Sequence, residues 1–299
     1  MKPRVSIITP SLGQGLFVGE TIRSVLSQDY PHIEHIVVDG GSNDNTIEIL
    51  SAFGDKITWI SEPDRGQADA VNKGFRLAKG DILGWLNSDD TYNPGAVATA
   101  VEHFDRHPEV VMVYGDAYYI DHDGKIVGRY STEPFRFGRL AESCFICQPA
   151  VFIRADVVKT VGELDTNLQL CMDYDYWIRI GKHYPPAMIR YLQGKYLANS
   201  RMHGQTKTVT MEEGHYQECL ETVKRHFGSV PPPWTCAYMN VVGVKDQMLR
   251  HEKRNIAVKA LVRLFYVTKK YGWRWGWRSF AVSCKEGIKY FRRRVGGMG

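Results

Sequence analysis

The sequence predicts an α/β fold, with a mostly parallel sheet covered by helices on both faces, followed by a helical C-terminal extension. Two observations predict it. From Val5 to Tyr114, short β-branched runs alternate with segments of helical periodicity, which is typical of parallel sheets with crossover helices. The proline run at 231–233 then interrupts the chain after a long helical segment. We therefore expect a main domain at 1–228 and an extension at 229–299.

The predicted elements of the first half follow one another in regular order. We expect strands at 5–9, 33–38, 57–60, 81–86 and 110–114, and helices at about 17–26, 45–53, 68–78 and 96–104. After Gly115 the pattern changes, because Asp123-Gly124 predicts a hairpin turn. The later elements are predicted as strands at 118–120, 126–130 and 151–153, and as helices at 156–161, 174–182 and 212–227.

The formal net charge of +5 is unevenly distributed along the chain. Residues 1–250 carry 25 Lys and Arg against 31 Asp and Glu, whereas residues 251–299 carry 13 against 2. The body is therefore mildly acidic and the tail strongly basic, which points to an anionic partner for the tail alone. We expect no nucleic acid partner, because the acidic body supplies no matching basic groove.

Location is predicted from what the chain lacks. The first residues hold no apolar stretch of signal-peptide length, and no uncharged apolar stretch reaches the ~18 residues that span a bilayer. The six cysteines are too sparse for a disulfide scaffold. Cys144 and Cys147 lie in an apolar run, so we expect buried, inert thiols rather than a metal or redox pair. These features predict a cytoplasmic protein.

Polar residues follow every strand of the predicted parallel sheet, at the edge where such sheets bind ligands. They are Pro10-Ser11, Asp39, the segment 62–67, Asn87-Ser88-Asp89-Asp90 and Gly115-Asp116. Acidic groups gathered at one edge are unfavourable unless a cation or a hydrogen-bonding ligand offsets their charge. The segment 87–90 offers hard oxygen ligands that suit Mg²⁺ or Mn²⁺ bridging to substrate phosphates. A simple helix-capping loop is the alternative reading of that segment.

The glycine-containing loop at 13–19 raises another class of function. It lies between a strand and a helix, and Asp39 ends the next strand, as in dinucleotide-binding folds. However, Val18 stands where the fingerprint requires glycine. A nicotinamide-dependent oxidoreductase therefore remains an alternative, as does a non-catalytic module that binds sugar or membrane.

Taken together, the motifs resemble the family 2 glycosyltransferases with a GT-A fold. The resemblance covers about residues 4–205 and rests on VSIITPS (5–11), TIRSVLSQ (21–28), IVVDGGS (36–42), EPDRGQADA (62–70), WLNSDD (85–90) and MDYDYWIR (172–179). It implies a Rossmann-like GT-A domain and an inverting, metal-dependent hexosyltransferase. The implied substrates are a nucleotide-sugar donor, UDP-linked, and a saccharide or lipid-linked acceptor in the biosynthesis of a bacterial surface polysaccharide.

The resemblance also implies roles for single residues. The implied contacts are Pro10, Ser11, Asp39, Arg65, Gln67, Asn87 and Ser88 for the nucleotide sugar, and Asp89 and His203 for Mg²⁺ or Mn²⁺. Asn87 stands where the family motif has Asp, and is expected to contact a ribose hydroxyl. Asp173 is implied as the catalytic base that deprotonates the acceptor, with Asp175 as its rival. Gln148 and Asp116 are weaker candidates, for which structural roles are favoured.

The tail combines basic and aromatic residues. Lys259 and Arg263 share one face of an apolar helical pattern, and Trp273, Trp275 and Trp277 are interleaved with arginine. Such stretches suit an anionic membrane surface. We expect the tail to dock the enzyme on the inner face of the plasma membrane. A helical cap packed on the catalytic domain is the alternative.

Overall fold

The structure is a computed structural model, and it describes residues 2–245. The described chain divides into two compact units, one formed by residues 2–137 and 144–206 and the other by residues 138–143 and 207–245. The sheet and all the candidate site residues lie in the first unit. The basic tail at 251–299 lies outside the described residues.

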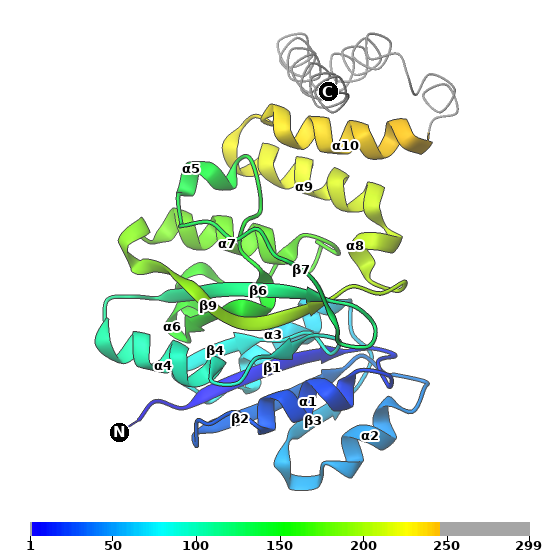
Figure 1. Cartoon of the computed structure of the whole chain (residues 1–299), viewed down its shortest axis with the longest axis vertical. Coiled ribbons are helices and arrows are strands. Elements are labelled where there is room, and N and C mark those ends of the chain that lie inside the picture. Colours follow the sequence, from blue (N-terminus) through cyan, green and yellow to red (C-terminus); the bar gives the residue numbers. More distant parts are fainter. Residues whose placement is uncertain (1, 246–299) are drawn as a thin grey trace, which may run out of the picture. The chain divides into compact units, whose positions relative to one another are not determined.

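The first unit is built on a nine-stranded mixed sheet (Figure 1). Its strands are β1 (Val5–Ser11), β2 (Ile33–Asp39), β3 (Thr58–Ser61), β4 (Ile82–Trp85), β5 (Thr91–Tyr92), β6 (Met112–Ile120), β7 (Ile126–Arg129), β8 (Val151–Arg154) and β9 (Ile189–Arg201). The spatial order is β3-β2-β1-β4-β8-β6-β9-β5, and β7 pairs with β6. Strands β3, β2, β1 and β4 are parallel, β8 is antiparallel to both β4 and β6, and β6 is parallel to β9.

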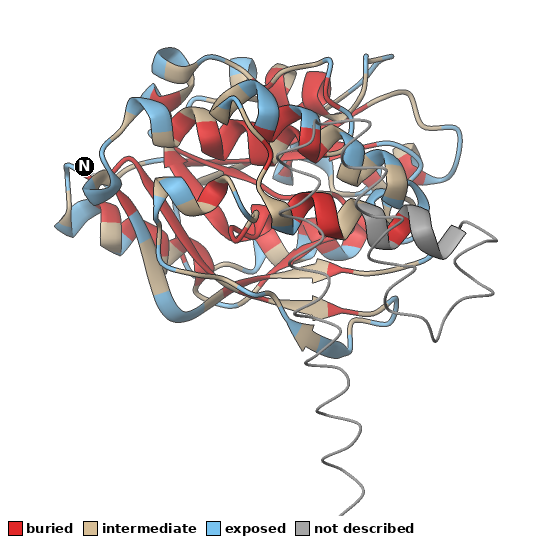
Figure 2. Ribbon diagram, turned by 90° about the horizontal axis from the view of Figure 1, so that it is seen from above, coloured by how far each residue is buried: buried red, intermediate tan, exposed pale blue. Residues whose placement is uncertain are grey.

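The helices of the first unit cover both faces of the sheet. They are α1 (Val18–Leu26), α2 (Thr46–Ala52), α3 (Gln67–Leu77), α4 (Ala96–Arg106), α6 (Asp156–Val161) and α7 (Met172–His183), with short 3₁₀ turns η1 (Gly54–Lys56), η2 (Gln148–Ala150) and η3 (Pro186–Met188). Helix α5 (Phe137–Leu140) lies where the chain passes from the first unit to the second. Figure 2 shows buried positions concentrated in the strands and along the helices beside them.

The alternation of side chains along β1 and β2 explains the two layers. Val37 packs against α1 and α2, and Ile7 packs in the same cluster as residues of α4. Ile36 and Val38 point to the opposite face and pack against α3. A Cβ at Gly74 of α3 would meet Ile8 at 2.3 Å, so this glycine lets α3 approach β1 closely. The core therefore lies on both faces, as the predicted fold class requires.

The predicted elements of the first half are all present, and the hairpin at Asp123-Gly124 joins β6 to β7. The sequence did not predict β5 or β9. Strand β9 runs for 13 residues without clean alternation, because its register against β6 shifts at Asp116. Asp116 accepts hydrogen bonds from the Tyr191 hydroxyl and, at 2.7 Å, from the Gly194 amide, and thereby holds this bulge together. The role favoured for Asp116 from the sequence, a structural one, fits this geometry.

The second unit contains α8 (Lys207–Thr210), α9 (Glu212–Phe227) and α10 (Pro232–Lys245). Helix α9 ends at Gly228, whose φ of 74° is the left-handed C-cap conformation. This division differs from the boundary at 228 predicted from the prolines, because α9 groups with α10. Pro232 and Pro233 occupy the first turn of α10, where a missing N–H removes no helical bond, so the run starts a helix. Among residues 2–245, no helix is long and apolar enough to cross a membrane.

Candidate active site

The carboxyl ends of β1 and β2 form the first part of the candidate site. Asp39 is fully buried, and its Oδ2 accepts hydrogen bonds from the amides of Gly41 (3.0 Å) and Ser42 (2.8 Å) and from the Ser61 hydroxyl (2.7 Å). Gly41 has a φ of 88°, which lets the turn curl its amides back onto the carboxylate. The Asp39 side chain is therefore held rigidly by its own turn.

Ser11 lies beside Asp39, because the two residues are paired in the β1–β2 register. Its side chain is buried, and its Oγ has no hydrogen-bond partner among residues 2–245. A buried hydroxyl without a partner is unfavourable unless a ligand or a water supplies one. Pro10 precedes Ser11 and is buried in the same strand end. Sequence and structure agree in placing these residues together.

The loop at 12–17 between β1 and α1 does not form a phosphate cradle. The backbone amides of Gly13, Gln14 and Gly15 donate to the side chains of Ser42, Thr46 and Asp44, at 2.7, 3.0 and 3.0 Å respectively. In a dinucleotide fold, such amides face the pyrophosphate. Because they bond to protein side chains here, the loop does not support the nicotinamide alternative.

Arg65 and Gln67 differ in their environments. The Arg65 side chain is 75% exposed and pairs with Asp69 at 3.2 Å, and its hydrogen bond holds the pKa of the Asp69 carboxyl below the usual value. Gln67 begins α3, and its Nε2 donates to Oδ1 of Asn87 at 2.7 Å. The start of α3 is thereby joined to the loop after β4.

The loop after β4 is the centre of the site. We call residues 87–90 the metal loop, because they include Asp89, which the resemblance implies as a metal ligand. Asn87 and Asp89 are partly exposed, whereas Ser88 and Asp90 are buried. The hydroxyl of Thr21 on α1 lies 2.9 Å from the carbonyl oxygen of Ser88 and 2.7 Å from that of Asp90, so α1 fixes the backbone of the loop.

The structure brings Asp89 and His203 together. Nε2 of His203 lies 3.0 Å from Oδ2 of Asp89, and the two side chains are 6% and 21% exposed. Nδ1 of His203 accepts from the Gln205 amide at 3.3 Å, so Nε2 carries the proton donated to Asp89. The His203 ring also packs at 4.8 Å against the ring of Phe17. Residues 114 positions apart thus meet at the metal loop, as the resemblance implies.

Arg201 is the site residue that sequence reasoning missed. Its side chain is fully buried, and its Nε donates to the Asp89 carbonyl at 2.8 Å. Its other nitrogens bond the Asp121 and His122 carbonyls of the β6–β7 turn and Glu20 of α1, the last at 2.7 Å. One guanidinium thus joins three segments to β9. The sequence offers only its position two residues before His203, which does not by itself indicate a buried guanidinium.

Asp90 is the buried carboxylate of the metal loop. Its Oδ1 accepts from the Arg201 amide at 2.8 Å, and its Oδ2 accepts from Nδ2 of Asn87 at 3.3 Å. Burial raises the pKa of the Asp90 carboxyl well above its usual value, and the neighbouring charge of Asp89 raises it further. Asp90 is therefore placed to fix the loop, while the more accessible Asp89 faces outward.

The two acidic candidates on α7 have different surroundings. Asp175 is 2% exposed and pairs with Nε of Arg179 at 2.7 Å, and Arg179 also bonds the carbonyls of Val161 and Glu163. Asp175 therefore ties α7 to the end of α6 and the residues after it. Asp173, in the first turn of α7, is partly exposed, and its Oδ1 accepts from the Tyr174 amide at 2.8 Å. Of the two, Asp173 is the one that a substrate could reach.

Asp173 shares an electrostatic environment with the metal loop. Burial raises the pKa of the Cys147 thiol, and the charges of Asp90 and Asp173 both raise it further. Burial and the charge of Asp173 also raise the pKa of Cys144. The buried thiol of Cys147 is thus within electrostatic reach of both carboxylates. Both cysteines are free, and their raised pKa values fit the predicted inert thiols.

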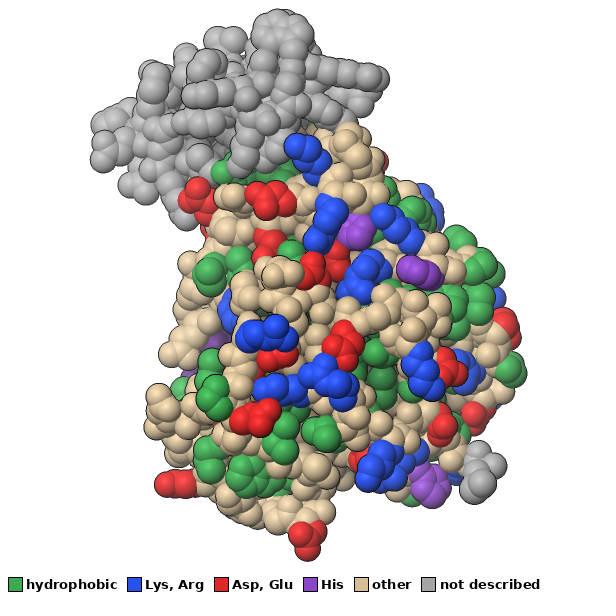
Figure 3. Space-filling model, turned by 180° about the vertical axis from the view of Figure 1, so that it is seen from behind, with side chains coloured by type: hydrophobic (Ala, Val, Ile, Leu, Met, Phe, Trp, Pro, Cys, Tyr) green, Lys and Arg blue, Asp and Glu red, His purple; other side chains and the backbone are tan. Residues whose placement is uncertain are grey.

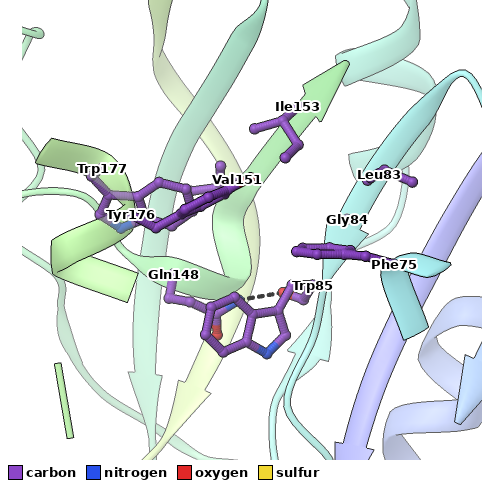
Figure 4. Close-up of a pocket in the computed structure, with 9 residues that line it drawn as sticks. All are labelled: Phe75, Leu83, Gly84, Trp85, Gln148, Val151, Ile153, Tyr176 and Trp177. Carbon is purple, nitrogen blue, oxygen red and sulfur yellow. Dashed lines mark hydrogen bonds between the residues drawn. The ribbon is translucent and has the colours of Figure 1, made fainter. Parts of the chain in front are cut away.

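A small cavity borders Trp85 and Gln148 (Figure 4). It holds about 10 Å³, which is about the room that one water molecule needs. The hydroxyl of Tyr176 and the indole N–H of Trp177, both on α7, are buried without a partner, and both residues line this cavity. Its volume fits a water molecule and not a sugar. Nε2 of Gln148 donates to the Trp85 carbonyl, drawn as the dashed line in Figure 4.

Comparison with known proteins decides the family. The model of Glycosyl transferase family 2 matches residues 6–161, more than half of the chain. The chain is a family 2 glycosyltransferase. It is 30% identical over 232 residues to an uncharacterized glycosyltransferase of Rickettsia typhi, covering 73% of this chain and 70% of the relative. It is 27% identical to a PGL/p-HBAD biosynthesis glycosyltransferase of Mycobacterium tuberculosis, covering 71% and 82%.

Solved structures show that this glycosyltransferase has the GT-A fold. S. aureus TarS 1–349, in complex with UDP-GlcNAc, aligns with a TM-score of 0.62 at 16% identity, covering 95% of this chain and 92% of that one. The mannosyltransferase PcManGT of Pyrobaculum calidifontis, in complex with GDP-Man and Mn²⁺, aligns with a TM-score of 0.58 at 17% identity, covering 97% and 87%. At these identities the likeness establishes the fold. The predicted fold class and enzyme class are confirmed.

Proposed function

We propose that this glycosyltransferase moves a hexose from a UDP-linked donor to a saccharide or lipid-linked acceptor, with inversion and with the help of Mg²⁺ or Mn²⁺. The observation that carries the proposal is the pairing of Asp89, in the metal loop, with His203 at 3.0 Å. The partly exposed Asp173, in the first turn of α7, supports it. Leaving-group stabilisation and acceptor deprotonation are the two tasks that such transfer needs.

Asp89 and His203 fit a divalent cation by their chemistry. Carboxylate oxygen and imidazole nitrogen suit Mn²⁺, and Mg²⁺ is held by one or two carboxylates plus substrate phosphates. Among residues 2–245 there is no cluster of three or more His, Cys, Asp or Glu arranged as ligands. Two protein ligands plus the donor diphosphate would match the site. His203 would bind the cation through Nε2 in the tautomer that carries its proton on Nδ1. When bound, the cation neutralises charge on the departing diphosphate.

The donor end of the proposal rests on Ser11 and Asp39. The unpartnered Ser11 hydroxyl and the rigid Asp39 turn lie at the sheet edge where nucleotides bind in open α/β folds. The structural relatives named above are complexes with UDP-GlcNAc and with GDP-Man and Mn²⁺. We propose that Pro10, Ser11 and Asp39 hold the base, and that the exposed Arg65 closes against the nucleotide.

We propose that Asp173 accepts the proton of the acceptor hydroxyl. Asp173 is partly exposed, and it stands in the first turn of α7, where the helix N-terminus stabilises negative charge. Asp175 is the weaker choice, because its carboxylate is occupied by Arg179. One base is sufficient, since the cation, rather than a protein acid, stabilises the leaving group.

The functional test measures transfer and separates the two carboxylate roles. Asp173→Asn should lower transfer by about 10²–10⁴-fold while UDP binding stays near the native value, because only the transition state uses the base. Asp156→Asn is the matched control, since Asp156 is an exposed carboxylate in the first turn of α6. Loss of UDP affinity in Asp173→Asn would assign this residue to donor binding. Transfer that survives EDTA and Asp89→Ala would exclude the metal role.

We also propose that the basic tail holds the enzyme on the cytoplasmic face of the plasma membrane. Residues 251–299 carry 13 Lys and Arg against 2 Asp and Glu, and each basic residue near an anionic surface contributes ~1 kcal/mol. On the face of the described residues shown in Figure 3, acidic and basic side chains are interspersed. The full chain should sediment with anionic vesicles at low salt, and Arg292, Arg293 and Arg294 changed to Gln should weaken this binding. Equal sedimentation with neutral vesicles would contradict the proposal.

A further inference from the structure

The side-chain amide of Asn87 uses all of its hydrogen-bonding capacity within the protein. Its Oδ1 accepts from Nε2 of Gln67 at 2.7 Å and from the indole Nε1 of Trp85 at 2.9 Å. Its Nδ2 donates to Oε1 of Gln148 at 3.0 Å and to Oδ2 of Asp90 at 3.3 Å. An amide has two acceptor positions and two donor hydrogens. A ribose hydroxyl could bond to Asn87 only after one of these four bonds had broken.

The direction of this amide is fixed by chemistry at both ends. The Trp85 indole is a donor only, so the Asn87 atom facing it must be the oxygen. The Trp85 carbonyl is an acceptor only, so the end of Gln148 facing it must be the NH₂ group. Gln148 therefore presents its oxygen to Asn87, whose NH₂ group donates a hydrogen bond to it. The side-chain amides of Asn87 and Gln148 and the indole N–H and carbonyl of Trp85 thus form a closed ring of hydrogen bonds that all run in one direction.

Aspartate at position 87 would break this polarity. One of its oxygens could replace Oδ1 of Asn87, but the other would face Oε1 of Gln148, which is an acceptor, and would lie beside the carboxyl of Asp90. Gln148 cannot reverse to help, because its oxygen would then face the Trp85 carbonyl. Asp90 is 3% exposed, so a second carboxylate beside it is poorly screened. The carboxylate that the family motif has at this position is therefore unsuited to this chain.

We propose that Asn87 is a positioning residue, with Gln148 as its orienting partner, and that its amide sets the metal loop through Asp90 instead of contacting the donor ribose. This role rests on the proposed metal-dependent function, and it differs from the ribose contact that the resemblance implies. The effect of Asn87 on the proposed cation site is indirect. Asp90 binds the Arg201 amide, and Arg201 binds the Asp89 carbonyl, so displacement of Asp90 moves Asp89.

The test compares UDP binding with and without Mn²⁺ by calorimetry, using the full chain. Asn87→Asp should weaken the Mn²⁺-dependent part of UDP affinity by about 10-fold or more, the range measured for outer-shell residues. Its UDP affinity without metal should stay within about twofold of native. Asn45→Asp adds the same charge at an exposed site of the same unit and should change neither value.

Two further measurements keep the outcome decisive. Gln148→Met removes the orienting partner without adding charge and should weaken Mn²⁺-dependent binding in the same direction. Thermal unfolding of the metal-free protein should show a lower midpoint for Asn87→Asp than for Asn45→Asp. If native UDP affinity does not respond to Mn²⁺, the proposed metal function fails. The measurements without metal still test the role of the Asn87 amide, because lower stability of Asn87→Asp with unchanged UDP affinity supports the positioning role.

The overturning results are equally specific. A native or improved Mn²⁺ response in Asn87→Asp, with an unchanged unfolding midpoint, would show that the position accepts the family's carboxylate. Weaker UDP binding in the absence of metal would show that Asn87 contacts the nucleotide. Either result removes the positioning role.

Discussion

Two parts of the candidate site lie at the ends of β2 and β4, the strands on either side of β1, and are held together in different ways. Asp39, after β2, is fixed by Gly41, Ser42 and Ser61, at most 22 positions away in the chain. The metal loop, after β4, is fixed by Gln148, Arg201 and His203, which follow it by 61 to 114 positions. We call Ser11 and the Asp39 turn, which are proposed to hold the nucleotide base, the base end; the bonds to Asp39 come from nearby sequence. The metal loop also depends on distant segments, among them α1, α3, η2 and the end of β9.

This difference predicts where substitutions are most damaging. At the base end, the bonds to Asp39 come from residues within 22 positions of it in the chain. At the metal loop, one buried side chain serves several segments, so its removal leaves polar groups in different parts of the chain without partners. The predicted losses of stability therefore fall from the metal loop to the base end.

The largest effect is expected for Arg201→Ala. It removes a fully buried guanidinium and leaves the carbonyls of Asp89, Asp121 and His122 without their donor. The free energy of unfolding should fall by about 3–5 kcal/mol, measured by urea unfolding. Arg201→Lys keeps the charge but cannot reach all four acceptors, so it should recover only part of the loss. A loss below about 1 kcal/mol in Arg201→Ala would contradict the joining role.

A smaller effect is expected for Asp44→Ala, which removes the brace of the β1–α1 loop. Burial raises the pKa of the Asp44 carboxyl, but hydrogen bonds from Thr46 and Gly15 together hold this pKa below its usual value. The loss at neutral pH should be about 1 kcal/mol, as for a helix cap.

The Asp44→Ala difference should depend on pH in one direction. Because the folded-state pKa is the lower one, the stabilisation is complete above the usual Asp pKa of about 4 and disappears as the pH falls through the folded value. Urea unfolding of both proteins across this range measures it. A difference that grows on acidification would contradict the assigned bonds.

The smallest effect on stability is expected for Ser11→Ala. The Ser11 hydroxyl is buried without a partner, so its removal should change the unfolding free energy by no more than about 0.5 kcal/mol. UDP affinity should nevertheless fall by about 5–10-fold, the value of one lost hydrogen bond. Thr9→Ala is a poor control, because the Thr9 hydroxyl bonds to His35. Ser51→Ala, at an exposed helical site, is the matched control.

The same contrast explains how far the sequence predicted the molecule. Strands β1–β4 and helices α1–α4 follow from local periodicity, and Asp39 follows from its position at the end of β2. Strand β9 was missed because its bulge between Leu192 and Tyr196, opposite Asp116 of β6, breaks the alternation. Arg201 could not be assigned a role without knowing that β9 lies beside β6 and passes the metal loop. Residues that act through distant contacts give no periodic signal.

The resemblance placed Asp89 and His203 in one site, and the structure brings them together. It could not show that Asn87 is saturated by protein partners, because that depends on the rotamers of Trp85 and Gln148. Nor could it separate Asp173 from Asp175, which differ through the Arg179 pairing. Residue types at motif positions were predictable, whereas their hydrogen-bond partners required the fold.

The division of the site is tested most directly by UDP binding, measured by calorimetry with and without Mn²⁺ in native protein, Ser11→Ala and Asp89→Asn. We expect Ser11→Ala to weaken UDP binding by a similar factor in both conditions, because the base end acts without metal. We expect Asp89→Asn to keep the metal-free UDP affinity and to lose the increase that Mn²⁺ brings. A Mn²⁺ response that survives in Asp89→Asn, or a metal-free affinity that Ser11→Ala leaves unchanged, would contradict the division of the site into a base end and a metal loop.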